Sequence, residues 1–356
     1  MSRRARTGAL PVSRSAGRIP GRGRRRVKRP WDGSLDVLRA GAAVLVVLLH
    51  CSGSLRPLAE FGPEWWGTAL LQAFTRSAVP LFVMISGALL IGPETENLAA
   101  FYRRRASRIL VPLIFWMLFY QLISTRGLSG RIVATIYGGT PYPHLWYLYM
   151  LLCLYFVLPA VSAAYRSMNR GWLVLLSLGL IGSTFLSYAY NLLVFHRFPV
   201  LFFPLKTIPF IGYALIGKVL YDALPRTRSS APFWLAGAIC VAAYPPLAAA
   251  CRSTTGFGSY ALWQTPASPL VLLESTAFFS AVLLLPAARR LGLTRGFRLL
   301  GQLSFGVYLI HPFLIWLLKQ CWKTAPLWYA GPVLLLSLAA AFGISRVPGV
   351  RKIIGL

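Results

Sequence analysis

The sequence predicts an all-α protein that crosses a membrane about ten times, with both termini in the cytoplasm. Three features indicate this fold class. Hydrophobic residues make up 56% of the 356 positions, more than the ~45–50% of soluble domains. Charged residues make up only 13%, and the mean hydropathy is +0.62. Finally, the apolar residues gather in runs of about the 20 residues that a spanning helix needs. A soluble or disordered protein of this length is thereby excluded.

The apolar runs predict ten spans, which alternate with short polar segments. The expected spans are 35–55, 69–91, 109–125, 145–164, 171–193, 200–221, 232–250, 268–288, 299–318 and 326–344.

The distribution of charge sets the expected orientation. Lys and Arg total 37 against 8 Asp and Glu, a formal net charge of +29. With the N-terminus inside, most of the basic residues fall on the cytoplasmic side, and the excess remains when the N-terminal tail is left out. This agrees with the positive-inside rule.

Residues 1–30 predict a disordered, basic cytoplasmic tail ahead of a membrane domain over 31–356. The tail holds 11 of the basic residues, and none of its apolar runs exceeds three residues. It therefore has no means of forming a core, and we expect it to contact anionic lipid. It carries no interleaved aromatic residues, so nucleic acid is not an expected partner. The five cysteines form no CxxC pair, which predicts neither a disulfide framework nor a metal site.

The first span carries three polar residues on one helical stripe. Arg39 and His50 are 11 positions apart, which places them on one face, roughly 16 Å apart along the axis. Asp36 precedes Arg39 by three positions, within reach of an ion pair. Charged groups inside spans are costly and mark functional positions. The alternative is that Asp36 and Arg39 only mark the interface, while His50 bonds a neighbouring helix.

An arginine cluster precedes the third span. The segment FYRRRASRILVP, 101–112, spaces Arg105 from Arg108 by three residues and Arg104 from Arg108 by four. Guanidinium groups match phosphate geometry, so the cluster predicts an anion clamp at the cytoplasmic edge. The alternative is a plain topology determinant.

Further polar residues lie in or beside the other spans. Arg76 precedes Pro80, and Ser86 with Gly87 permits a close helix approach. Lys206 and Glu274, near the starts of the sixth and eighth spans, line a polar cavity or pair with each other. In the fourth span, the residues His144, Trp146, Tyr147 and Tyr149 indicate an aromatic belt at the outer surface.

The ninth span repeats the pattern of the first. Ser304, Tyr308 and His311 are spaced i, i+4, i+7 and share one face. Pro312 frees a backbone carbonyl and kinks the helix. His311 and His50 are then expected to face a shared cavity.

These segments together resemble acyltransferase family 3, in particular stand-alone members similar to bacterial O-acetyltransferases of surface polysaccharides. The matching segments are LDVLRAGAAVLVVLLH, VPLFVMISGALL, RRRASR, HLWYLYMLLCLYFVLP and LGQLSFGVYLIHPFLI, in the family's order. The resemblance implies ten core helices, a first-helix histidine acting as base, here His50, and arginines that hold the acyl-CoA phosphates, here Arg105 and Arg108. The basic tail is not part of the family pattern.

We therefore expect an acyl-CoA-dependent O-acyltransferase of the bacterial cell membrane, with acetyl-CoA as the commonest donor. The acceptor is expected to be a hydroxyl of a sugar, a glycan or a glycosylated small molecule. Acyl-CoA is a substrate, and no bound cofactor is expected. A hydroxyl or ring nitrogen must stabilise the oxyanion, and Tyr308, His311 and Ser86 remain open for that role. The rival function is a proton-linked transporter or flippase, which would use His50, Glu274 and His311 as a relay.

Overall fold

The computed structural model describes residues 32–52, 62–92, 97–125, 143–195, 203–255, 260–321 and 328–356. In these residues the regular structure is entirely helical, as predicted. The predicted tail, 1–30, lies outside the described residues. The α-helices are α1 (Gly33–Cys51), α2 (Pro63–Thr75), α3 (Ala78–Leu90), α4 (Leu98–Thr125), α6 (Trp146–Ser167), α7 (Arg170–Phe195), α8 (Ile208–Ala223), α9 (Ala231–Thr255), α10 (Tyr260–Trp263), α11 (Pro269–Leu284), α12 (Pro286–Gly292), α13 (Arg295–Cys321) and α14 (Ala330–Arg346). Short 3-10 helices are η1 (Pro143–Leu145), η2 (Phe203–Thr207) and η3 (Val350–Ile354).

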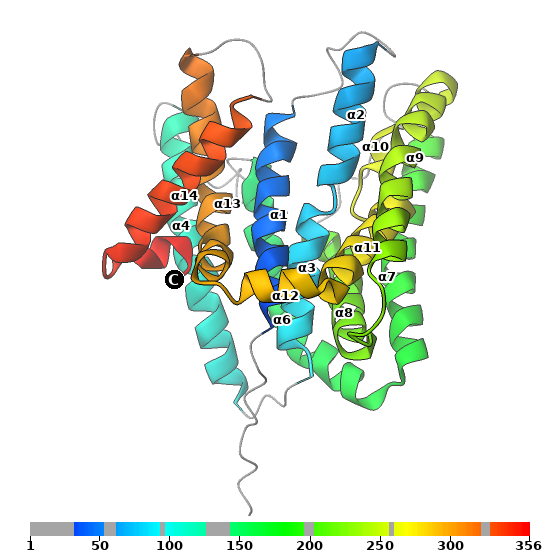
Figure 1. Cartoon of the computed structure of the whole chain (residues 1–356), viewed down its shortest axis with the longest axis horizontal. Coiled ribbons are helices and arrows are strands. Elements are labelled where there is room, and N and C mark those ends of the chain that lie inside the picture. The colour runs from blue at the N-terminus through cyan, green and yellow to red at the C-terminus, as the bar shows by residue number, and fades with distance from the viewer. Residues whose placement is uncertain are drawn as a thin grey trace, which may run out of the picture. The chain divides into compact units, whose positions relative to one another are not determined.

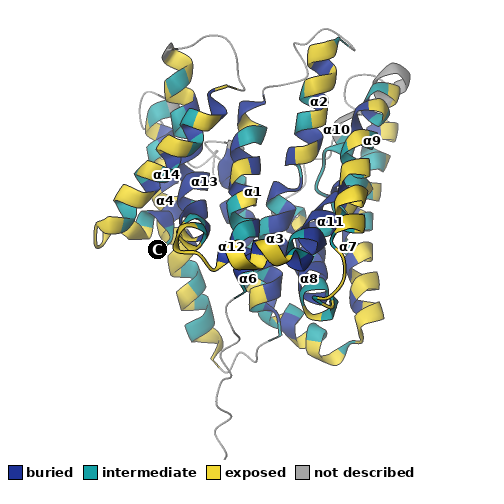
Figure 2. Ribbon diagram, viewed as in Figure 1, coloured by how far each residue is buried: buried dark blue, intermediate teal, exposed yellow. Residues whose placement is uncertain are grey.

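Helix α1 lies at the centre of the bundle. It packs against α13 on one side and against α3 and α12 on the other, as Figure 1 shows. In α1 and α13, 56% and 61% of the apolar span is buried, whereas α7 and α9 bury only 22% each. The outward faces of α7 and α9 are correspondingly exposed (Figure 2). The polar residues of α1 and α13 therefore face the protein interior, where such residues are expected in a membrane protein.

Small residues let α3 and α8 cross in close contact. A Cβ atom on Gly87 would lie 1.9 Å from the carbonyl oxygen of Ala214, and one on Gly217 would lie 2.4 Å from that of Met84. Only glycine permits this approach of two backbones. The predicted role of Gly87 beside Ser86 is confirmed.

Two predicted spans are broken in the structure. The second extends over α2 and α3 and is interrupted at Arg76 and Ser77, because Pro80 has no N–H with which to bond the carbonyl of Arg76. The eighth ends at Leu285, and α12 leaves it at 75°. Leu285 is extended (φ −76°, ψ 111°), the conformation favoured before a proline, here Pro286.

The chain is an all-α polytopic membrane protein. Among the described residues, seven helices are long and apolar enough to cross a membrane, or eight if α11 and α12 form one bent span. Every predicted span overlaps a helix or helix pair, but α8 and α14, with 16 and 17 residues, are shorter than a usual span. The count of ten and the cytoplasmic termini stay predictions.

The last described turn folds back onto the bundle. The indole Nε1 of Trp116 on α4 donates a hydrogen bond to the carbonyl of Ile353, 2.9 Å away. Ile354 is buried in the main core. This docking holds η3 against α4 and brings Gly355 to the cavity described below.

Candidate active site

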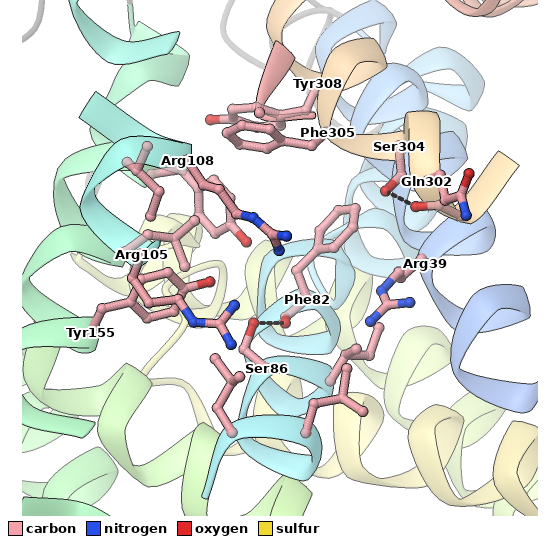
Figure 3. Close-up of a pocket in the computed structure, with 18 residues that line it drawn as sticks. Arg39, Phe82, Ser86, Arg105, Arg108, Tyr155, Gln302, Ser304, Phe305 and Tyr308 are labelled. Atoms are coloured by element: carbon pink, nitrogen blue, oxygen red, sulfur yellow. Dashed lines mark hydrogen bonds between the residues drawn. The ribbon is translucent and has the colours of Figure 1, made fainter. Parts of the chain in front are cut away.

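Three arginine side chains converge on one cavity of about 260 Å³. Arg39 comes from α1, and Arg105 and Arg108 come from α4. Figure 3 shows their guanidinium groups directed toward the centre of the cavity from opposite sides. The structure thus brings together Arg39 and the arginine pair, which sequence reasoning placed in two separate segments. Arg104 lies exposed on α4 and is not part of the cavity wall.

Helix α4 positions Arg105 and Arg108 because it begins well before the predicted span. At a spacing of three residues both side chains leave the same face of the helix. The Arg105 guanidinium lies 5.9 Å from the ring centroid of Phe101 and 5.9 Å from that of Tyr155. Cation–π contacts of this kind stabilise the charged group and restrict its motion. Arg105 is therefore held in place, whereas Arg108 is more exposed.

The predicted ion pair of the first helix is present. Arg39 Nη1 lies 2.7 Å from Asp36 Oδ1, and the Asp36 side chain is almost fully buried. A Cβ atom on Gly301 of α13 would lie 2.9 Å from the same oxygen, so α13 closes tightly over the carboxylate. A guanidinium has five N–H donors. Arg39 therefore keeps donors for an anion in the cavity while Asp36 fixes its position.

The rest of the cavity wall is formed largely by apolar side chains and by side chains that carry a hydroxyl group. The hydroxyl of Ser86 donates to the carbonyl of Phe82, 3.0 Å away, and Tyr155 lies beside it. Sequence reasoning did not predict several residues of the wall, because their spacing in the sequence gave no signal beyond apolar periodicity. These residues are Phe82, Ile85, Leu89, Leu90, Ile109, Tyr147, Leu151, Tyr155, Gly301, Gln302, Phe305 and Gly355. A charged end and an apolar wall together suit a ligand that carries phosphates on a flexible chain.

Three histidines gather beyond the cavity. The ring centroid of His311 lies 5.1 Å from that of His50 and 5.9 Å from that of His144. His311 and His144 are buried, whereas His50, in the last turn of α1, is exposed. The rings of His50 and His311 thus lie close together, but neither residue lines the arginine cavity, and a cavity shared by the two histidines stays a prediction.

The aromatic-belt prediction is wrong for His144 and Tyr147. Both are buried, at 2% and 5% exposure, because the start of α6 turns this face toward α4 and α13. The His144 ring packs 4.9 Å from the ring of Tyr120. Trp146 is half-buried against Phe210 of α8. His144 thus belongs to the histidine cluster.

Tyr120 of α4 contacts the backbone of α13 around Pro312. Its hydroxyl donates to the carbonyl of Leu309, 2.8 Å away, and accepts from the N–H of Phe313, 3.2 Å away. In a regular helix that N–H would bond that carbonyl directly. The tyrosine oxygen is thus inserted between the two backbone groups of α13, and an insertion of this kind is a known cause of helix bending. This contact fixes the part of α13 that carries His311.

Tyr308 connects the cavity with the histidine cluster. It lines the cavity, and its ring centroid lies 5.9 Å from that of His311. Its hydroxyl donates to the backbone carbonyl of His144. Ser304, one turn earlier, also lines the cavity and donates to the carbonyl of Gly301. The shared face predicted for Ser304, Tyr308 and His311 is confirmed.

The remaining predicted residues lie outside the cavity wall. Arg76 Nη2 donates to Gln264 Oε1, 2.6 Å away, and the Gln264 amide donates to Gln72 Oε1, 2.6 Å away. Glu274 is buried and lies within interaction range of Arg76 and Ser77. Lys206 lies in η2. Sequence spacing gave no signal for the contact between Arg76 and Gln264, because the two residues, which directly follow α2 and α10, are remote in the chain.

The arrangement suits group transfer from an anionic donor. Three cationic groups can hold phosphates, and an apolar wall leads from them to Tyr308 and the histidines. Within the described part of the chain, no group of three His, Cys, Asp or Glu side chains is placed to hold a metal ion.

Comparison with known proteins agrees with this chemistry. A family model described as "Acyltransferase domain" matches residues 32–346. Neither the curated proteins nor the solved structures give a match.

Proposed function

The chain belongs to acyltransferase family 3, and from this membership we propose that it moves an acyl group from acyl-CoA to a hydroxyl of a carbohydrate-type acceptor. Acetyl-CoA is the proposed donor, and a bacterial cell membrane is the proposed location. The observation that carries the proposal is the position of Tyr308, between a cavity walled by three arginines and a cluster that contains an exposed histidine.

The donor would bind through its phosphates. Arg105 and Arg108 would form charge-assisted hydrogen bonds to phosphate oxygens, and Arg39 would complete the clamp from the opposite wall. The pantetheine arm would follow the apolar wall formed by Phe82, Ile85 and Leu151. Its thioester end would then lie near Tyr308.

The chemical step would begin at His50. An unprotonated ring nitrogen of His50 would take the proton of the acceptor hydroxyl as its oxygen attacks the thioester carbon. The carbon–oxygen bond forms, the carbon–sulfur bond breaks, and the departing thiolate receives the proton from His50. The products are the acyl ester and free coenzyme A. The hydroxyls of Tyr308 and Ser86 are the candidate donors for the oxyanion. Each would have to turn away from the carbonyl to which it now donates, that of His144 and that of Phe82.

Purified protein in detergent tests this function. Incubation with radiolabelled acetyl-CoA and a panel of mono- and oligosaccharides should release free thiol and label an acceptor in equal amounts. If the protein is a transporter or flippase instead, proteoliposomes should show movement of a solute across the bilayer without any release of thiol.

A further inference from the structure

The His311 side chain is completely buried, at 0% exposure, and within the described ranges only one of its ring nitrogens has a hydrogen-bond partner. Nδ1 lies 3.1 Å from the carbonyl oxygen of Val307, one helical turn earlier. Nε2 is buried without a hydrogen-bond partner among the described residues. A buried polar atom of this kind costs free energy and marks a position where a ligand or a moving group completes the bond.

The surroundings of Nδ1 determine where the proton of the neutral ring lies. A carbonyl oxygen only accepts hydrogen bonds, so Nδ1 must carry the proton. The Val307 carbonyl therefore takes the proton of the neutral ring at Nδ1, and Nε2 is left with an unprotonated lone pair.

A bare Nε2 accepts a hydrogen bond and does not donate one. Neutral His311 therefore cannot be the oxyanion donor, a role that remained open from the sequence. The polar ring that lies nearer to His311 is that of His50, whose centroid is 5.1 Å away with the two planes tilted by 38°, whereas the centroid of His144 is 5.9 Å away. At this ring separation a small rotation, or one bridging water, joins a nitrogen of His50 to Nε2.

We infer that His311 is a positioning residue for His50. Its Nε2 accepts the N–H of His50, which places the other nitrogen of His50 as an unprotonated base toward the acceptor hydroxyl. When that nitrogen takes the hydroxyl proton, His50 becomes an imidazolium whose existing N–H still points at Nε2. The proton later leaves with the thiolate, and His311 keeps its own proton throughout. This inference rests on the proposed function, because it assigns the partner of the proposed base.

The division of roles follows from exposure. His50 is exposed and can meet a substrate, whereas His311 is sealed in the core between α1, α4 and α13. The insertion of Tyr120 into the α13 ladder holds the turn around Pro312. A buried acceptor on a fixed helical turn is suited to orient an exposed imidazole.

Two substitutions at His311 test the inference in the full-length protein. His311→Phe keeps a flat ring but removes the acceptor, and His311→Gln can present a side-chain oxygen near the position of Nε2. We expect His311→Phe to lower kcat for transfer from acetyl-CoA by about 10²-fold, with the KM for acetyl-CoA within twofold of wild type. His311→Gln should recover most of the loss and stay within about tenfold of wild type. Equal losses in both variants, or a kcat for His311→Phe within threefold of wild type, would overturn the inference.

Spectra of the wild-type protein show directly which ring nitrogen of His311 carries the proton. This measurement needs neither turnover nor a folded His311→Phe variant. The chain has four histidines, so ¹⁵N-histidine spectra of the wild-type protein in lipid nanodiscs can be assigned by single substitutions. His311 should show a protonated Nδ1 and an unprotonated Nε2. His50 should show one fixed tautomer, which His311→Gln keeps and His311→Phe makes mixed. A protonated Nε2 on neutral His311 would contradict the inference. If wild-type protein transfers nothing from acetyl-CoA, the proposed function fails, and the tautomer spectra still decide the role of His311.

Discussion

The hydroxyl of Tyr308 donates a hydrogen bond to the backbone carbonyl of His144, and this contact joins the wall of the arginine cavity to the histidine cluster. Tyr308 comes from α13 and His144 from the turn that starts α6. The two are distant in sequence, and only the packing of α6 beside α4 and α13 brings them together. One hydroxyl is therefore placed where a donor thioester would meet the histidines.

Replacing Tyr308 by Phe should remove the hydroxyl while leaving the shape of the cavity unchanged. The ring still lines the wall, so the KM for acetyl-CoA should change less than twofold. If the hydroxyl stabilises the oxyanion, kcat should fall by about 10²-fold. Tyr149→Phe on α6 is the matched control and should retain wild-type kcat, because the Tyr149 hydroxyl lies 3.5 Å from the Met117 sulfur and Tyr149 is not part of the cavity wall. Steady-state kinetics on both variants make the comparison, and an unchanged kcat for Tyr308→Phe would remove Tyr308 from the chemistry.

The arginine pair should control affinity for the donor. Arg105→Ala and Arg108→Ala should each raise the KM for acetyl-CoA by about tenfold or more, since a charge-assisted hydrogen bond contributes ~1.5–3 kcal/mol. The KM for the acceptor should change far less. Arg→Lys should restore only part of the affinity if the phosphate contact is bidentate.

The control for the pair is Arg103→Ala. Arg103 lies exposed on the same helix and outside the cavity wall, so its removal should leave the KM for acetyl-CoA unchanged. Equal shifts in all three alanine variants would show that the cluster acts only on topology or general electrostatics.

Gly355 should be essential for the shape of the cavity. Its φ is +75°, and a Cβ atom there would lie 2.8 Å from the Phe305 ring and 3.2 Å from the Arg108 carbonyl. Gly349 has a similar φ of +85° but open space around it. Both Gly→Ala changes carry the strain of a left-handed conformation, about 1 kcal/mol or more. Only Gly355→Ala should also raise the KM for acetyl-CoA, and a matching effect from Gly349→Ala would reduce the role of Gly355 to folding.

Deletion of residues 2–28 should leave both turnover and orientation intact. The tail carries 11 basic residues but none of the proposed site, and the basic excess of the remaining loops favours the same orientation. Weaker attraction to anionic vesicles is expected, ~1 kcal/mol for each basic residue at the surface. Protease accessibility and an acyl-transfer assay in neutral detergent check the truncated protein. An inverted topology, or loss of transfer, would assign the tail a role in folding or catalysis.

Much of the site was predictable because it lies on single helices. The faces shared by Arg39 and His50, and by Ser304, Tyr308 and His311, follow from helical spacing alone, and the structure has them facing one another across the α1–α13 contact. The pair of Asp36 and Arg39 is likewise a local contact.

The features that escaped prediction depend on which helices become neighbours. His144 was assigned to a surface belt because composition shows an aromatic run but not the face that α4 and α13 cover. Gly355 and Phe305 meet only because η3 folds back onto α4. The breaks at Arg76 and Leu285 carried local signals in Pro80 and Pro286, but the long apolar runs concealed them.

The central claim is that an exposed His50, in a histidine cluster that Tyr308 joins to the arginine-walled cavity, is the base for acyl transfer from acyl-CoA. The direct measurement is a single-turnover assay with radiolabelled acetyl-CoA, comparing wild-type protein with His50→Ala after coenzyme A binding has been verified for both by calorimetry. We expect His50→Ala to bind coenzyme A with wild-type affinity and to lose transfer by at least about 10³-fold. Wild-type transfer by a folded, coenzyme A-binding His50→Ala protein would contradict the account.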